Sequence, residues 1–356
     1  MKRFYIILLC LLFASCEEYF TPDIDEQEPQ YAFECLITNQ PDVYKLSITK
    51  TSGYGSSNKI EIVTDAKAKI ITSDSAIYPL LYNSTNGCYC SNPDKFIGQI
   101  GKSYQLQVTT ADGKTFKSDV VEMLDCPDIE FVNAQYYYKK KLVTTGAGYI
   151  EEGEDGILVN NTTYAQGYTP YYRYECKLLL QSRQHYPEAI PIERYIYRPI
   201  SGYGNLYLAN ANDYVDNKII ENKLCNTAYV SLNYQDPYIL PEKEFSVRNI
   251  GEFVSVKQYS LNEKEFLFWE AIKDQQTNTN YLFGQIENQP VSNIKGVNGE
   301  KALGYFCVSA VKEKLRAFSL SLRDREVRPF SVPYFPDLDS VTIYDAQPDF
   351  YISFTN

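Results

Sequence analysis

Histidine is almost missing from this sequence, since His185 is the only one among 356 residues. A metal site built from several histidines is therefore excluded, and a Ser-His-Asp triad would depend on that one side chain. His185 lies in the polar stretch Ser-Arg-Gln-His-Tyr-Pro-Glu, which is typical of a surface position. The sequence also lacks a Gly-x-Ser-x-Gly elbow and a complete Gly-x-x-x-x-Gly-Lys-Ser/Thr phosphate loop. We therefore expect no catalytic residue, no metal and no cofactor, and we do not expect an enzyme.

Positive charge is scarce as well. The chain has 34 Lys and Arg against 45 Asp and Glu, which gives a formal net charge of −11 at pH 7. An acidic protein repels the phosphates of nucleic acids, so a nucleic acid partner is not expected. Anionic lipid surfaces do not attract it electrostatically either, so membrane attachment has to come from a covalent lipid.

The most apolar stretch lies at the N-terminus and is too short for a permanent membrane span. Lys2 and Arg3 precede the apolar residues 5–13, and the small residues Ala14 and Ser15 lead to Cys16. This order predicts a lipoprotein signal peptide over residues 1–15 and a diacylglycerol on the Cys16 thiol. The alternative is an ordinary signal peptide in which Cys16 is incidental.

Residues 16–30 are acidic and contain proline, which predicts a solvated tether. Glu17 and Glu18 directly follow Cys16, and this resembles the acidic export signal that carries lipoproteins of the Bacteroidetes to the cell surface. We therefore expect a protein that is lipid-anchored in the outer membrane and faces the cell exterior. A plain linker facing the periplasm is the alternative.

Nine cysteines include Cys10 in the leader and Cys16 at the anchor, so seven remain. An exported protein can oxidise such residues, but an odd number leaves at least one unpaired, and the connectivity cannot be read from spacing. Cys88 and Cys90 are two residues apart, so they would face the same side of a strand. Zinc is not expected there, because no second pair and no histidine is near in the sequence.

The fold class predicted is mainly β, because 33 tyrosines accompany many short alternating stretches with turn signals. We expect an immunoglobulin-like β-sandwich over residues 31–125, followed by a larger β-sandwich domain over residues 126–335 with one short helix. Its residues 182–224 are polar and contain three prolines, which indicates an irregular insertion. Residues 336–356 are expected to form a tail along the surface.

Two local signals are clear. Residues 103–109 alternate apolar and polar side chains, and Asp112-Gly113 then predicts a hairpin turn into residues 114–121. Ser260-Leu-Asn-Glu263 predicts a capping box at the start of the helix. Leu267 and Ala271 would belong to the buried stripe of this helix, and Trp269, the only tryptophan, would anchor it.

Tyrosine crowds the middle of the chain, and its large amphipathic ring suits partner surfaces and carbohydrate platforms. Strand alternation alone would bury about half of these rings. Tyr203 and Tyr207 lie in the irregular insertion and are the candidate binding residues. The acidic run at residues 151–156 contains the carboxylates that Ca²⁺ prefers, but a solvated hairpin loop is the favoured interpretation.

Several motifs with weak individual specificity occur together in one order. They lie at residues 34–38, 43–47, 98–106 with Gly113, 268–270, Gln275, 282–283, 289–290, 293–294 and 303–306 with Ser309. As a set they resemble the domain-of-unknown-function 4249 family of Bacteroidetes outer-membrane lipoproteins, over residues 31–322. Asp74-Ser75-Ala76 and Asp339-Ser340-Val341 also resemble the sites at which Bacteroidetes O-glycosylate exported proteins, although both serines can equally stay unmodified.

The resemblance implies no catalytic residues. It implies an outer-membrane lipoprotein whose relatives are often encoded beside TonB-dependent receptors. We therefore expect an accessory or interaction partner of such a receptor in nutrient uptake. The alternative is a surface module that binds a glycan or peptide through its Tyr-rich loops. A hydrolase is the least supported function.

Overall fold

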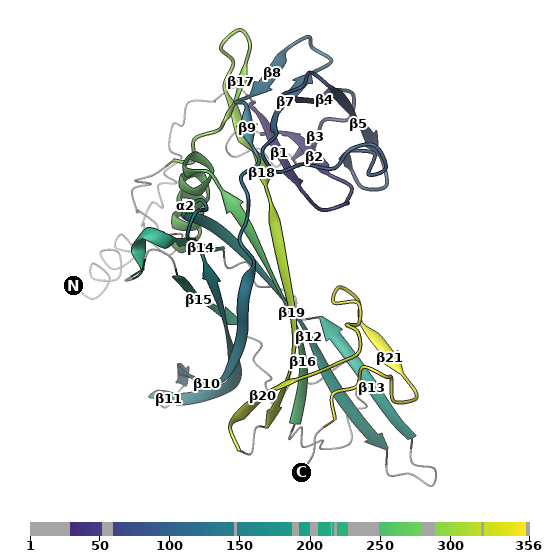
Figure 1. The fold of residues 1–356 in the computed structure, drawn as a ribbon, viewed down its shortest axis with the longest axis vertical. Coiled ribbons are helices and arrows are strands. Elements are labelled where there is room, and N and C mark those ends of the chain that lie inside the picture. The colour runs from purple at the N-terminus through teal and green to yellow at the C-terminus, as the bar shows by residue number, and fades with distance from the viewer. Residues whose placement is uncertain are drawn as a thin grey trace, which may run out of the picture.

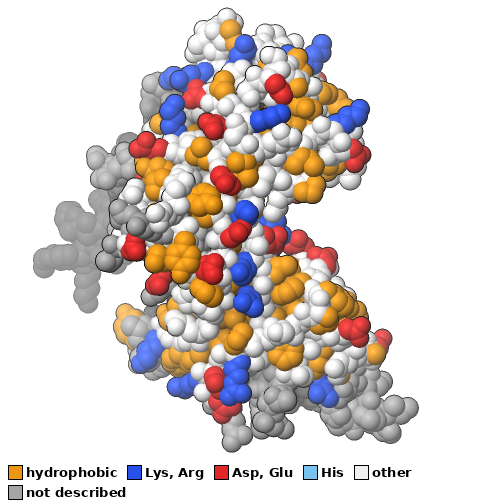
Figure 2. All heavy atoms as spheres, viewed as in Figure 1, with side chains coloured by type: hydrophobic (Ala, Val, Ile, Leu, Met, Phe, Trp, Pro, Cys, Tyr) orange, Lys and Arg blue, Asp and Glu red, His pale blue; other side chains and the backbone are white. Residues whose placement is uncertain are grey.

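The computed structural model describes residues 29–51, 60–145, 148–186, 192–199, 206–214, 216, 219–226, 249–278, 289–321 and 324–353. Within these residues the protein is mainly β, with three sheets and one α-helix (Figure 1). The predicted fold class is therefore confirmed. Two lobes are stacked along the long axis of the molecule, and Figure 2 shows a narrower waist between them.

The first lobe is an eleven-stranded sheet whose strands follow the order β17-β8-β7-β4-β5-β6-β2-β1-β18, with β3 beside β2 and β9 beside β7. The bounds are β1 Tyr31–Thr38, β2 Lys45–Lys50, β3 Glu61–Ile62, β4 Lys67–Thr72, β5 Ile77–Asn83, β6 Cys88–Cys90, β7 Ser103–Thr109, β8 Thr115–Ser118, β9 Val121–Glu122, β17 Ile294–Gly296 and β18 Ala302–Ser309. Alternate side chains of β1 and β7 point into one apolar core, as period-two strands require.

The hairpin predicted at Asp112-Gly113 is present. Strand β7 pairs with β8, and Gly113 adopts a φ of 83°, which a residue with a Cβ rarely takes. Tyr104, Leu106 and Val108 are each 1% exposed, so the alternation in the sequence identified the buried face correctly.

Strands β17 and β18 correct the predicted domain boundaries, which placed them in the second domain. Strand β18 pairs in parallel with β1 along its whole length, from Tyr31 opposite Ala302 to Thr38 opposite Ser309. Gly304 lies within this ladder at a φ of 85°, and a Cβ there would be 1.9 Å from the carbonyl oxygen of Phe33. Two strands that pair although most of the chain lies between them leave no local pattern in the sequence. The spacing of residues alone could therefore not reveal this pairing.

The second lobe contains a seven-stranded sheet, ordered β20-β19-β16-β12-β13-β21 with β14 beside β12, and a three-stranded sheet, ordered β10-β11-β15. The bounds are β10 Ile129–Thr145, β11 Gly148–Tyr164, β12 Tyr171–Tyr186, β13 Ile192–Pro199, β14 Tyr207–Asn210, η1 Ala211–Asp213, β15 Ile219–Asn226, β16 Asn249–Leu261, α2 Glu263–Asn278, β19 Val311–Ser321, β20 Glu326–Phe330 and β21 Thr342–Tyr344. One apolar core continues from the first lobe between these two sheets, where Val159 and Leu224 join Tyr174 and Val254.

Three expectations for this lobe were wrong. The described part of residues 182–224 is largely regular, because β12 continues to Tyr186 and pairs with β13 as a hairpin. The acidic run at residues 151–156 belongs to strand β11 and not to a loop. The C-terminal segment is part of the core, since Phe350 and Ile352 are buried and Gln181 exchanges two 3.0 Å hydrogen bonds with the backbone of Ile352.

Helix α2 is longer than predicted and begins two residues later. Its N-cap is Asn262, whose side-chain oxygen accepts a hydrogen bond from the Glu265 N–H at 2.9 Å. Ser260 still belongs to β16, and its hydroxyl donates to the Leu124 carbonyl at 2.7 Å. The helix buries Phe266, Phe268 and Ala271, whereas Leu267 is 54% exposed and does not belong to the buried face.

Strands β18 and β19 are separated by Ala310 alone and run on from the first sheet into the second lobe (Figure 1). The helix lies beside this passage. Among the described residues, no helix combines the length and the apolar character that a membrane span requires.

Candidate functional site

A cleft of about 580 Å³ lies where the first lobe meets the start of helix α2. One wall comes from the connection between β8 and β9, and the other from the first residues of α2. Its lining is Asp119, Val120, Val121, Glu122, Leu124, Asn262, Glu263, Lys264, Asn293 and Tyr305. The cleft thus brings together four segments that are far apart in the sequence.

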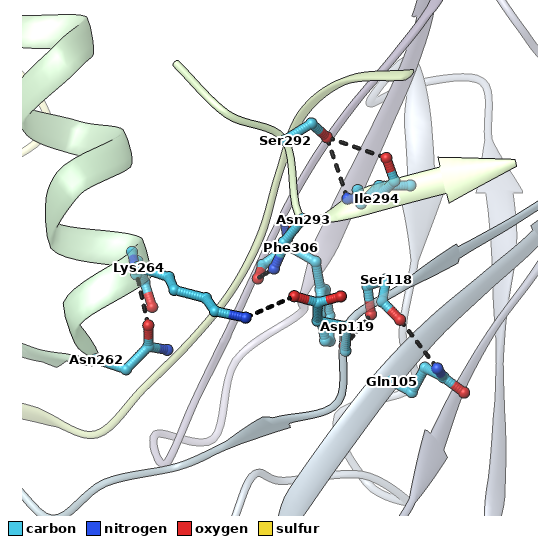
Figure 3. A network of polar contacts seen from close by, with 10 residues as sticks. Gln105, Ser118, Asp119, Asn262, Lys264, Ser292, Asn293, Ile294 and Phe306 are labelled. Carbon is cyan, nitrogen blue, oxygen red and sulfur yellow. Dashed lines mark hydrogen bonds and ion pairs between the residues drawn. The ribbon is translucent and has the colours of Figure 1, made fainter. Parts of the chain in front are cut away.

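An ion pair spans the two walls. The Lys264 Nζ lies 3.3 Å from Asp119 Oδ2, as Figure 3 shows. The Lys264 side chain is 78% exposed and the Asp119 side chain 43%, so solvent screens the pair and its contribution to stability is small. The pair can therefore open at little cost and leave both charges available to a ligand.

Asn293 fixes the floor beside this ion pair. Its side-chain amide donates to the Phe306 carbonyl and its side-chain oxygen accepts from the Phe306 N–H, both at 2.9 Å (Figure 3). Its own carbonyl accepts a hydrogen bond from the Asp119 N–H at 2.7 Å. Asn293 is 5% exposed, so its two hydrogen bonds to Phe306 of β18 are shielded from water. They hold Asn293, and with it the Asp119 backbone, against the sheet.

Tyr305 of β18 forms part of the lining although only 4% of it is exposed. Its ring lies 4.5 Å from the Phe268 ring of α2, at an interplanar angle of 34°. Burial raises the pKa of its hydroxyl, and the nearby charges of Glu265 and Asp119 add to the shift, so the phenol stays neutral. Among the described residues this hydroxyl has no hydrogen-bonding partner, so it is a free donor and acceptor at the cleft.

A second polar layer lies below Tyr305. Glu265 is 1% exposed, and its Oε1 accepts a hydrogen bond from the Ser309 hydroxyl at 3.4 Å, whereas its Oε2 has no partner. Burial raises the pKa of Glu265 to about 7, although Cys307 and Arg173 oppose the shift. The helix therefore carries a carboxyl that exchanges its proton near neutral pH.

Arg173 of β12 completes this layer. Its guanidinium lies 2.9 Å from Glu175 and over two aromatic rings, 4.2 Å from the Tyr259 centroid and 4.9 Å from that of Trp269. Trp269 of α2 is half-buried and packs against clusters formed by α2 and strands of both lobes. The cation therefore joins the helix to the second lobe immediately beneath the cleft.

The charges of the lining decide what the cleft can hold. Asp119, Glu122 and Glu263 contribute three carboxylates against the single cation of Lys264. With the free Tyr305 hydroxyl, they suit a ligand that offers hydrogen-bond donors or positive charge. Among the described residues, no three metal-ligating side chains lie close enough together to hold a metal ion.

The candidate residues predicted from the sequence do not meet at this cleft. Cys16 and Tyr203 lie outside the described residues. Tyr207 begins β14, opposite Tyr174 of β12, and is half-buried against the main core, so it is less available than a loop position would be. His185 lies in β12 opposite Glu193 by backbone register.

Sequence reasoning missed Asp119, Lys264 and the role of Tyr305. A signal existed for part of this set, because Asn293 and Tyr305 both lie in motifs that carry the family resemblance. Asp119 and Lys264 stand in ordinary charged surroundings, and only the fold brings them together.

The family model for a domain of unknown function, DUF4249, matches residues 17–315. The chain belongs to this family. The DUF4249 match covers the first lobe, the second lobe as far as the start of β19, and every residue that lines the cleft. Neither curated proteins nor solved structures gave a match.

Proposed function

We propose that this DUF4249 protein is a lipid-anchored lipoprotein of the outer membrane that works beside a TonB-dependent receptor in nutrient uptake. The leader that ends at Cys16 supports the anchor, and Glu17-Glu18 support an orientation toward the cell exterior. Membership of the family supports the receptor partnership, since the sequence resemblance links it to Bacteroidetes lipoproteins. The role proposed is binding and presentation, without a chemical step.

The observation that carries a binding role is the cleft between the lobes. Its walls are held by buried bonds such as those of Asn293, while its rim contains the exposed pair Asp119–Lys264. A rigid floor with a labile rim suits reversible capture of a polar ligand, because little ordering is needed on binding. The proposed occupant is a short cationic or donor-rich segment of a nutrient or of the receptor.

The receptor partnership is tested by isolation of the tagged full-length protein from native outer membranes in mild detergent. We expect one TonB-dependent receptor to be recovered with it. A Cys16→Ser variant should lose the lipid and leave the membrane fraction, which tests the anchor separately. Recovery of the lipoprotein alone under several detergents would contradict the partnership.

Binding at the cleft is tested with arrays of lysine-containing peptides and neutral glycans. Tyr305→Phe removes only the free hydroxyl, and Asp119→Asn removes one carboxylate, so both should weaken a peptide signal several-fold. Glu130→Gln removes an exposed carboxylate outside the cleft and is the matched control. Equal signals for all variants would place the ligand elsewhere.

A second candidate is a glycan- or peptide-binding module that uses tyrosines, and one observation favours it. Strands β10 and β11 and the turn after them present exposed rings. These are Tyr137, Tyr138, Tyr149, Tyr164 and Tyr168. Tyr149 is 76% exposed, far more than the half-buried Tyr207. A glycan signal that falls in Tyr149→Ala but persists in Tyr305→Phe would favour this second site.

A further inference from the structure

Cys88 and Cys90 of β6 lie side by side on one face of the first lobe. Their sulfur atoms are 3.8 Å apart. Strand β6 lies between β5 and β2, with Cys88 opposite Asn83 and Cys90 opposite both Leu81 and Lys45. A tight turn precedes the strand, and its Gly87 has a φ of 64°. The two thiols are thus held in near contact by a paired strand.

The surroundings of the two thiols differ. Cys88 is 8% exposed, whereas Cys90 is half-buried and reachable from solvent. The Asn86 side-chain amide donates a hydrogen bond to the Cys90 sulfur at 3.6 Å. Burial is the main cause that raises the pKa of Cys88, so its thiol is the less reactive one at rest. Cys90 is therefore the sulfur that meets a reagent first.

Other described cysteines are unlike this pair. Cys35 and Cys126 are each 1% exposed, and burial raises their pKa values to about 12 and about 11. Burial also raises the pKa of Cys307 well above its ordinary value. Thiols of this kind are inert because the reactive thiolate is suppressed and shielded. Cys88 and Cys90 combine mutual contact with access, which the buried Cys35, Cys126 and Cys307 lack.

A bond between these two sulfurs would be strained. Residues i and i+2 of an extended strand have Cα atoms about 6.6 Å apart, from a rise of about 3.3 Å per residue. Disulfides usually join Cα atoms roughly 4.4–6.8 Å apart, so the pair sits near the long limit. Strained and accessible disulfides are more easily reduced than buried structural ones. A bond formed here would therefore open more readily than a buried structural disulfide.

We propose that Cys88 and Cys90 form a reversible dithiol–disulfide pair that exchanges with the disulfide of a small thiol. In the first step the Cys90 thiolate attacks one sulfur of the small disulfide, forms a mixed disulfide and releases one small thiolate. Cys88 then loses its proton to solvent and attacks the Cys90 sulfur, which releases the second small thiolate. The two protein thiols are oxidised by two electrons, and one small disulfide is reduced to two thiols.

The effect on the fold should be local. Tyr89 lies between the two cysteines, is 1% exposed, and its hydroxyl accepts a hydrogen bond from the Ala66 N–H at 2.8 Å. This buried ring keeps the middle of β6 in place. Closure of the bond would therefore draw in Cys90 and disturb its pairing with Lys45 and Leu81, while the core behind Tyr89 stays intact.

The test uses the purified full-length protein in detergent, equilibrated with glutathione buffers of increasing oxidised fraction. Acid quenching, thiol counting and peptide mass mapping then locate the bonds. We expect two thiols to be lost together, a bond within the peptide that contains Cys88 and Cys90, no retained glutathione, and full reversal in reduced buffer. Cys88→Ser should instead retain one glutathione on Cys90, because the second attack is missing.

Cys126→Ser is the matched control, since it removes a buried thiol and should leave the exchange unchanged. A thermal unfolding midpoint for each variant shows that it is folded, and Cys88→Ala replaces Cys88→Ser if the hydroxyl is not tolerated. The proposal is overturned if the native protein holds a stable glutathione on Cys90. Two thiols that stay reduced in the fully oxidised buffer, or a bond from either cysteine to another one, would overturn it as well.

Discussion

The two lobes differ in how fully their buried polar side chains are hydrogen-bonded. In the first lobe the buried Ser, Thr and Asn side chains of the described residues all have partners: for example, Ser91 accepts from the Tyr44 N–H and Ser118 from the Leu106 N–H, both at 2.9 Å. Apart from the Tyr305 hydroxyl at the cleft, the buried polar atoms without a hydrogen bond lie in the second lobe or helix α2, as far as the structure describes the chain. They belong to Asn161, Tyr172, Arg173, Tyr174, Asn222, Glu252, Glu265 and Trp269.

This difference in hydrogen bonding implies a difference in stability between the two lobes. An unsatisfied buried polar group carries a desolvation penalty of about 1–3 kcal/mol, so the second lobe gives up stability that the first lobe keeps. Asn161 and Asn222 are direct neighbours on β11 and β15, and the Tyr174 hydroxyl lies among the same buried groups without a bond of normal geometry. Such groups can be recruited by water or by a partner, which fully bonded ones cannot.

The largest effect should come from disrupting the first lobe where β1 and β18, far apart in the sequence, approach most closely. Gly304→Ala would force a Cβ to within 1.9 Å of the Phe33 carbonyl oxygen at a φ of 85°, and we expect a loss of more than about 3 kcal/mol in the free energy of unfolding. Gly113→Ala has nearly the same φ, 83°, but open space around it. It should cost only about 1–2 kcal/mol. Urea unfolding of both variants separates the cost of the steric clash with Phe33 from the cost of the positive φ. Equal losses of unfolding free energy in the two variants would refute this account.

The next effect should come from Glu252, which is fully buried in β16. Burial raises its pKa to about 8, so the folded protein holds a proton that the unfolded chain releases above its ordinary pKa of 4.5. Stability is therefore full below about pH 4.5 and falls as the pH rises through about 8. Glu252→Gln should be more stable than the native protein at pH 9 by on the order of a few kcal/mol, and this difference should shrink to less than about 1 kcal/mol at pH 5.

Urea midpoints measured from pH 5 to 9 test this prediction. Glu265 adds a slope of the same sign, because its pKa is raised to about 7, so the slope in Glu252→Gln should shrink without vanishing. Glu130→Gln, at an exposed carboxyl, is the control and should keep the native profile. A native profile for Glu252→Gln would mean that the carboxyl is not desolvated in solution.

The same substitution, Asn to Ala, can be made at a hydrogen-bonded position in the first lobe and at an unbonded position in the second. Asn293→Ala leaves the N–H and carbonyl of Phe306 unpaired in the core, and we expect a loss of about 2–4 kcal/mol. Asn161→Ala removes a side chain that makes no hydrogen bond of normal geometry and should cost less, about 1 kcal/mol, through lost packing. Thermal unfolding of the two variants gives the difference. A larger loss for Asn161 would show that its polar atoms are engaged in solution.

The smallest effect is expected at the rim of the cleft. Lys264→Met removes the exposed ion pair with Asp119 and should change the free energy of unfolding by less than about 0.5 kcal/mol. Double-mutant analysis with Asp119→Asn measures the coupling directly. A coupling above about 1 kcal/mol would show that the rim is a structural clasp and not a labile edge.

The sequence predicted local structure well where apolar and polar residues alternate regularly. The alternation of Tyr104, Leu106 and Val108 identified both a strand and its buried face, and Asp112-Gly113 identified its turn. The start of α2 was misplaced by two residues because Ser260 and Asn262 both qualify as N-caps. Only the fold decides between them, since the Ser260 hydroxyl is taken by the Leu124 carbonyl.

The cleft was hidden from sequence reasoning because its parts are distant and individually ordinary. Asp119 and Lys264 meet at 3.3 Å across 145 positions of sequence. Tyr305 was one tyrosine among many, and the search for binding rings favoured an insertion whose Tyr207 turned out to lie in a strand against the core. Contacts of this range depend on sheet order, which the hydrophobic pattern leaves open.

The parallel pairing of β1 with β18 has a consequence for the timing of biogenesis. A polypeptide emerging N-terminus first presents Tyr31–Thr38 long before Ala302–Ser309 exists to cover it. During that interval one edge of the early sheet is open to other strands, which is a hazard for aggregation. Protection by a chaperone until residue 309 has been synthesised would avoid this exposure. Folding of this chain is therefore expected to be slow and to finish only after its last third has been delivered.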